Sequence, residues 1–154
     1  MITIRLLYEI CWSIELIGII GHVQKVFDPI TELKFTSIQL ISTNHSLTHG
    51  DHLLLLREER KRNTSDTDMS LWLTCSNNSF TGGQAWKNVL NTINACGSIK
   101  YINNQYNVHA ICHEIGHIIG LNHNFQEATV MSYSPLTDIT FMQWEYDVMK
   151  QKIN

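Results

Sequence analysis

The run HEIGHIIGLNH at positions 113–123 constrains this chain more than any other feature. His113 and His117 are four residues apart, and residues at this spacing lie one above the other on an α-helix, so both imidazoles can reach a single ion. Gly120 can adopt the positive-φ backbone that ends a helix, which would let His123 approach the same ion from beyond the helix. The run therefore predicts a helix that carries ligands for one metal ion.

Three histidines with a neighbouring carboxylate match the donor set of a catalytic zinc site. Zinc takes four ligands, so three protein nitrogens leave one position for water, whose pKa falls to about 7 there. Glu114 lies beside the expected ion without binding it, and we predict that it acts as a general base and later as a proton donor. The alternative is an amphipathic helix whose histidines align by chance. It fits poorly, because the pattern extends over Gly120, His123 and a methionine at 131.

The histidine run and the downstream string Val-Met-Ser-Tyr at 130–133 resemble the metzincin metallopeptidases, in which an extended histidine motif precedes a turn containing methionine. The spacing is similar to that of the matrix metalloproteinases (matrixins), because Met131 follows His123 by eight positions and the motif contains Gly-Leu-x-His. The resemblance implies a zinc site with Met131 in the turn beneath the metal, Glu114 as the catalytic carboxylate, and three ligands: His113, His117 and His123.

Tyr133 departs from the matrixin pattern, which usually has proline at this point. The Met-x-Tyr string instead resembles astacins and serralysins, in which the tyrosine approaches the zinc and helps to stabilise the tetrahedral intermediate. We give equal weight to an alternative in which Tyr133 packs under the site. Asn124 also departs, since matrixins have serine and adamalysins have aspartate there, so the groups that surround the ligands stay unassigned.

The resemblance implies an α+β fold, an α/β-type sandwich of the metzincin kind. Its parts would be a twisted mixed sheet, a long zinc-binding helix, a Met-turn and a carboxy-terminal helix. Residues 1–154 would form a single catalytic domain, with a sheet-containing upper part to about 123 and a lower part from about 124. The chain length and its 44% of hydrophobic residues suit one domain with a sizeable core.

Hydrophobic periodicity predicts a similar order of elements. Strands are expected over 2–8, 33–41, 53–56, 71–73 and 98–102, and helices over 12–27, 105–119 and 141–150. Pro29 should end the first helix, because the residue before a proline disfavours the helical conformation. The strand at 53–56 is predicted from a continuous apolar run of the kind that is buried on both faces.

Residues 82–86 fit two structures. Gly83, Gln84, Ala85 and Trp86 resemble the start of the matrixin edge strand, with which an extended substrate pairs by main-chain hydrogen bonds. A helix is the alternative, because apolar residues at 85, 89, 90 and 93 recur at helical spacing. Beyond Met131, residues 134–139 would line the pocket for the side chain that follows the scissile bond.

A second metal site is left open. Matrixins carry a structural zinc and calcium ions on a long loop that is hard to find here. His45, His49, Asp51 and His52 form a local cluster that could bind a metal, and the alternative is a polar loop. One catalytic Zn²⁺ is therefore the expected cofactor, while a structural zinc or calcium ion stays undecided.

The other histidines and the cysteines are interpreted as structural. His22 and His109 are expected to lie at the surface or to have hydrogen-bond partners. The four cysteines are too few and too scattered for a disulfide scaffold. A pair between Cys75 and Cys96 is the only one that we consider, and Cys112 should pack into the core.

Composition limits the partners. The net charge is −3 with both signs scattered, which gives no reason to expect nucleic acid or an anionic membrane. The basic run at 57–62 contains two glutamates and is interpreted as a solvated strand end or loop. No segment approaches the about 20 apolar residues of a membrane span. We expect a monomer that acts on a protein or peptide substrate.

The compartment cannot be read from the amino terminus. Glu9 and Glu15 interrupt the apolar stretch that a signal peptide would need. The resembling families are mostly secreted, with a signal peptide and a pro-segment, and neither is visible here. Localisation is therefore left open.

The expected function is zinc-dependent hydrolysis of internal peptide bonds, that is, a zinc metalloendopeptidase. The alternative from another class is a catalytically weak metal-binding module of the same fold that docks peptides along the edge strand. The two differ in one respect: hydrolysis should vanish in Glu114→Gln, whereas peptide docking should survive.

Overall fold

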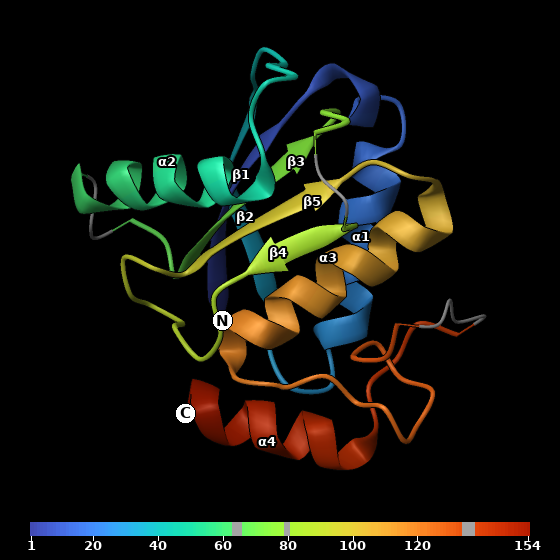
Figure 1. Ribbon diagram of the computed structural model, residues 1–154. Coiled ribbons are helices and arrows are strands. Elements are labelled where there is room, and N and C mark those ends of the chain that lie inside the picture. The colour runs from blue at the N-terminus through green and yellow to red at the C-terminus, as the bar shows by residue number, and fades with distance from the viewer. Residues whose placement is uncertain (63–65, 79–80, 134–137) are drawn as a thin grey trace.

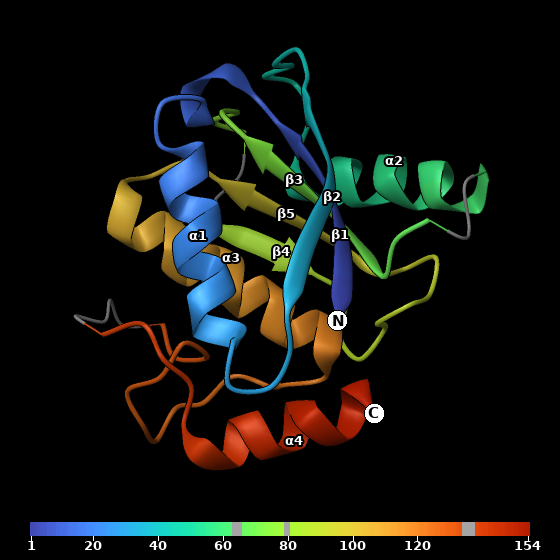
Figure 2. The same cartoon turned by 180° about the vertical axis from the view of Figure 1, so that it is seen from behind.

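Five strands of the described residues form one mixed sheet with the order β2-β1-β3-β5-β4. The computed structural model (Figures 1 and 2) describes residues 1–62, 66–78, 81–133 and 138–154. The strands are β1 (Ile2–Tyr8), β2 (Leu33–Leu40), β3 (Met69–Thr74), β4 (Gly83–Ala85) and β5 (Cys96–Lys100). All neighbouring pairs are parallel except β4 and β5, which are antiparallel. The edge strand β4 is therefore the one that reverses direction.

Helices cover both faces of this sheet (Figures 1 and 2). A short 3₁₀ helix, η1 (Ile10–Trp12), leads into α1 (Leu16–Phe27), which packs with α3 (Asn104–Ile119) on one face. The helix α2 (His49–Arg62) covers the other face, and α4 (Gln143–Ile153) lies below α3. The predicted α+β fold class is confirmed. None of the described helices is both long and apolar enough to cross a membrane.

Alternation along β1 explains the two cores. Ile4 and Leu6 pack into the main core with α1 and α3, whereas Leu7 points to the opposite face and packs against α2. Residues of a strand alternate between the two faces of its sheet, so one strand supplies both cores. The face that carries α3 is the face that carries the predicted zinc ligands.

The predicted strand at 53–56 is wrong, because these residues lie within α2. Leu53 and Leu56 are buried, whereas the two leucines between them are exposed, which is a helical pattern. Thr48 and Asp51 form reciprocal hydrogen bonds at the helix start, from Thr48 N to Asp51 Oδ2 at 2.9 Å and from Asp51 N to Thr48 Oγ1 at 3.2 Å. This capping pair favours a helix that starts here, whereas the apolar run at 53–56 is compatible with either a helix or a strand.

The chain near the edge strand resolves the other open alternative. Residues 83–85 are a strand, and no helix follows them before β5 in this described stretch. Asn88 and Asn91 have positive φ angles of 54° and 62°, which a continuous helix does not accommodate. The helical alternative for this region is therefore wrong.

The only disulfide among the described residues joins Cys11 to Cys75, which links η1 to the residue after β3. The pair considered from the sequence, Cys75 with Cys96, is wrong. Cys96 is a free buried thiol on β5, in the smaller core under α2, and Cys112 is a buried free thiol as predicted. The two bonded cysteines are 64 residues apart in the chain and meet only because β1 and β3 are neighbours in the sheet.

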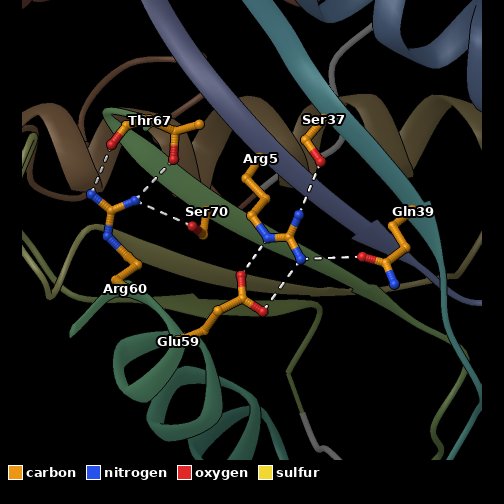
Figure 3. Close-up of polar contacts among 7 residues, drawn as sticks. All are labelled: Arg5, Ser37, Gln39, Glu59, Arg60, Thr67 and Ser70. Atoms are coloured by element: carbon orange, nitrogen blue, oxygen red, sulfur yellow. Dashed lines mark hydrogen bonds and ion pairs between the residues drawn. The ribbon is translucent and has the colours of Figure 1, made fainter. Parts of the chain in front are cut away.

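Arg60 lies in the run that was interpreted as a solvated strand end or loop, but its side chain is only 8% exposed. Its guanidinium donates to Thr92 O at 2.9 Å, to Thr67 Oγ1 and Ser70 Oγ at 3.2 Å each, and to Thr67 O at 3.1 Å. Figure 3 shows the bonds of Arg60 to Thr67 and Ser70 beside the contact of Arg5 with Glu59. Arg60 therefore ties the end of α2 to the segment that enters β3.

We predict that Arg60→Met lowers the free energy of unfolding by about 2 kcal/mol, because the buried Ser70 hydroxyl and the carbonyls of Thr67 and Thr92 lose a charged donor. Arg62 belongs to the same run and is exposed, so Arg62→Met is the matched control and should change stability by less than about 0.5 kcal/mol. Urea denaturation of the two variants would measure both values. Equal losses would contradict the structural role of Arg60.

Candidate metal centre

The helix α3 begins and ends where its sequence dictates. The side chain of Asn103 accepts a hydrogen bond from Tyr106 N at 3.1 Å, which caps the first turn. At the other end, Gly120 has a φ of 134°, and its N–H donates to Gly116 O. This conformation favours glycine because it is strained for residues with a side chain. The chain then turns back toward the helix and brings His123 to the two histidines that α3 carries.

The three histidines predicted as ligands converge. The Nε2 atom of His117 lies 3.1 Å from Nε2 of His113 and 3.0 Å from Nε2 of His123. Among the described residues this is the only group of three or more His, Cys, Asp or Glu side chains that could hold one metal ion. Two of these imidazoles are buried and the third is partly exposed at the mouth of a cleft.

In two of the imidazole rings the nitrogen that does not face the other histidines contacts a backbone carbonyl. Nδ1 of His113 lies 2.8 Å from Val130 O, and Nδ1 of His117 lies 2.7 Å from Leu121 O. A carbonyl oxygen only accepts, so each Nδ1 must carry the proton and each Nε2 must carry a lone pair. Lone pairs about 3 Å apart repel one another unless a cation lies between them.

Protons do not supply that cation. Burial lowers the pKa of His113 to about 4, and it also lowers the pKa of His117 and His123. The imidazoles are therefore neutral near pH 7. Neutral imidazole nitrogens, held in place by backbone carbonyls, are ligands that suit Zn²⁺. The residues present fit a zinc ion.

Glu114 lies beside these ligands and is only 5% exposed. Burial raises the pKa of its carboxyl group to about 8. Its Oε2 atom is buried without a hydrogen-bond partner among the described residues. The edge strand lies close to the same carboxylate, since a Cβ atom on Gly83 would lie 2.9 Å from Glu114 Oε1. The carboxyl group therefore faces the cleft under the start of β4.

Met131 and Tyr133 occupy different places around the ligands. Met131 is fully buried, and its sulfur packs against Gly116, the residue before His117 on α3. The hydroxyl of Tyr133 lies 3.0 Å from His123 Nδ1, and the side chain is 66% exposed. Tyr133 therefore does not pack under the site; it lies on the open side of the cleft.

A cleft of about 520 Å³ is lined by the three histidines, Glu114 and Tyr133. Of the residues predicted for the edge strand, Gly83, Gln84 and Ala85 line this cleft, whereas Trp86 packs on the other side with the α2 core. The segment predicted at 134–139 cannot be placed as a whole, because residues 134–137 lie outside the described residues. Sequence reasoning missed other lining residues, among them Lys87, Tyr106, His109 and Ser132.

The cluster considered for a second metal has a different role. His49 and His52 are buried, and their Nδ1 atoms lie 2.7 Å and 2.9 Å from Ser98 Oγ. Nε2 of His49 also lies 2.9 Å from Thr81 O, just before β4. Asp51 caps α2. Within the described residues these side chains form no metal-holding group, and they connect α2 to the segment that enters the edge strand.

His109 is buried, and its Nε2 donates to Ser132 O at 3.1 Å. It therefore has a partner, as expected. Its place in the cleft could have been predicted, because His109 is four residues before His113 and therefore lies on the same face of α3.

Comparison with known proteins supports these observations. The family model Reprolysin_5, described as metallo-peptidase family M12, matches residues 22–149. An archaemetzincin from Methanopyrus kandleri has a similar structure, with a TM-score of 0.76 and 15% identity over 99% of this chain and 95% of that chain. A chain from a chaperone–substrate complex gives a TM-score of 0.67 and 17% identity, over 97% of this chain and 33% of that one.

At these identities the two structural likenesses show the fold alone, which is metzincin-like. This chain spans about a third of the length of the chain in the chaperone–substrate complex. A search of curated proteins found no significant match.

Proposed function

The chain belongs to metallo-peptidase family M12, and from this premise we propose that it is a zinc endopeptidase whose ligands are His113, His117 and His123. The observation that carries the proposal is the convergence of three imidazole Nε2 atoms beside a buried carboxylate, on the floor of a cleft bordered by an edge strand. A zinc ion held there would supply a Lewis acid that polarises a carbonyl and lowers the pKa of water.

Glu114 handles the proton. Its carboxylate can take a proton from the attacking water and pass it to the leaving amine, and both events occur on the cleft side of α3. A carboxyl group works best for such transfers when its pKa lies near the working pH. Burial moves the pKa of Glu114 in that direction.

Tyr133 and β4 position the substrate. The Tyr133 hydroxyl, on the open side beside His123, can donate a hydrogen bond to the oxyanion that forms at the scissile carbonyl. Residues 83–85 form the last strand of the sheet and line the cleft, so an extended peptide can pair with them by β-augmentation. The lining includes Thr81 and Gly82 before the strand and Lys87 after it, which lets a peptide extend past the ligands in both directions and favours internal cleavage.

Finer assignments follow from the same residues. The eight-position spacing from His123 to Met131 supports a matrixin-like arrangement, combined with the Met-x-Tyr string of astacins. We treat residues 1–154 as a single catalytic domain that acts as a monomer. The sheet-containing part, to about 123, would contribute the edge strand and ligands, and the remainder would contribute Met131 and Tyr133.

The experiment that tests the proposal is digestion of a diverse peptide mixture, read by mass spectrometry. New internal termini should appear with zinc-loaded protein, disappear after 1,10-phenanthroline treatment, and return when zinc is added. Removal of terminal residues only would contradict internal cleavage. Zinc-loaded protein that binds peptides and cleaves none would favour the peptide-docking module.

Gly83 is predicted to position Glu114. A Cβ at this position would lie 2.9 Å from Glu114 Oε1 and 3.1 Å from Ser98 O, so Gly83→Ala must displace the carboxylate or the strand. We expect kcat/KM to fall by about 100-fold, since small misplacements of a catalytic group have effects of this size. Zinc content should stay unchanged, as measured by atomic emission.

Gly18→Ala is the matched control for this prediction. Gly18 lies on the exposed side of α1, and its Cβ would have no neighbour within 4 Å. The control should keep full activity and gain about 0.5–1 kcal/mol in stability, because alanine favours a helix over glycine. Wild-type activity in Gly83→Ala would contradict the prediction that Gly83 positions Glu114.

A further inference from the structure

Lys87 brings a positive charge to the cleft. It follows β4 by two residues and lines the cleft with the three histidines. Its ammonium group contacts only Asn122 Oδ1, at 3.4 Å, and forms no ion pair within the part of the chain that the structure describes.

The backbone next to Lys87 is fixed to the ligand helix. Asn88 N donates to His117 O at 2.9 Å, and Val89 N donates to Ile118 O at 2.9 Å. The residue therefore sits at a defined place relative to the ligands, although its side chain is exposed. Glu114 is the only described carboxylate in the cleft lining, and it is buried on the floor.

The direction of the edge strand tells which part of a substrate would pass Lys87. Gly83 lies over Glu114, and the chain runs from there through Ala85 to Lys87. Antiparallel pairing is the more stable arrangement for an added strand. A peptide paired in this way runs from Lys87 toward Gly83, so its residues before the scissile bond pass the ammonium group.

We propose that Lys87 selects substrates with an aspartate or glutamate side chain on the amino-terminal side of the scissile bond. The inference rests on the proposed function, because it assumes a peptide laid along β4. An exposed ion pair of this kind changes affinity by about two- to five-fold and weakens as salt increases.

The test uses tripeptides that end in a hydroxamate, which binds zinc and directs the peptide to the side before the scissile bond. Sets differ only in Glu, Gln or Lys at one position, and the Kd for zinc-loaded protein is measured by fluorescence anisotropy. At one of the three peptide positions, the Glu peptide should bind about two- to five-fold more tightly than the Gln peptide, and the Lys peptide should bind more weakly than both. The difference should shrink in 0.5 M NaCl.

Lys87→Glu should reverse this order. Lys34 is an exposed lysine on β2 outside the cleft lining, and Lys34→Glu makes the same change in net charge, so it should keep the wild-type order. Equal Kd values for Glu and Gln, a preference that survives in Lys87→Glu, or no binding of any probe would overturn the proposal. Because binding needs no turnover, a Glu preference without peptide cleavage would instead count against the proposed function alone.

Discussion

Glu114→Gln is expected to lower kcat/KM for peptide hydrolysis by about 10²- to 10⁴-fold, while one zinc ion stays bound. The amide has nearly the same shape as the carboxylate in a site where the side chain is only 5% exposed, but it cannot accept the proton of the attacking water. The measurement is the rate on the best peptide found in the mixture, together with zinc content. Glu32→Gln, at an exposed glutamate before β2, is the matched control and should keep wild-type kinetics.

Stability against pH gives the same variant a second readout. Burial raises the pKa of Glu114 to about 8, from 4.5 when unburied, so chelator-treated protein should lose stability as the pH rises through this window. The slope is at most about 1.4 kcal/mol per pH unit. Glu114→Gln should remove this contribution, so urea denaturation should find the chelator-treated variant more stable than wild type at pH 8 and similar below pH 5.

The rate of hydrolysis and the pH dependence of stability test two different statements about Glu114, its role as the base and its burial. If Glu114→Gln keeps full hydrolysis, another group is the base. If it loses hydrolysis but the stability difference does not depend on pH, the carboxylate is not buried in the metal-free protein as described. A wild-type chain that binds peptides without cleaving them would favour the docking module, and Glu114→Gln would then bind equally well.

The zinc ligands could be predicted because their placement is almost entirely local. Residues four apart on one helix must share a face, and Gly120 permits the turn that returns His123. Both features depend on residues 113–123 alone, and the structure has the helix and the positive φ there. The prediction of a strand at 53–56 was wrong because a short apolar run fits a strand or a helix equally well. The Thr48–Asp51 capping pair, which favours a helix, was overlooked.

Contacts between distant segments could not be predicted in this way. Cys11 meets Cys75 only because the strand order places β1 beside β3. Arg60 is buried because α2 packs over the start of β3, whereas the charge pattern of its neighbours suggested solvent. Lys87 lines the cleft because its neighbour Asn88 is bonded to the end of α3. Such positions depend on topology, which no local spacing in the sequence encodes.

His117→Ala should remove stoichiometric zinc. His117 is the central ligand, because its Nε2 lies 3.1 Å from His113 Nε2 and 3.0 Å from His123 Nε2. Loss of a group that merely orients a ligand weakens metal binding by 10- to 100-fold, so loss of the ligand itself should weaken it by more than about 100-fold. Atomic emission on protein dialysed against limiting zinc would measure the loss.

Thermal unfolding tests the same assignment without turnover. Zinc at about 100 times its Kd should stabilise the wild-type protein by about 2.7 kcal/mol, and this gain should be absent in His117→Ala. His123→Ala should behave alike, and it leaves α3 intact because His123 lies beyond the helix. His22→Ala, at an exposed histidine of α1, should keep both zinc and the gain. A normal gain in both ligand variants would mean that the metal is held elsewhere, because no site can lose its central ligand and keep its affinity.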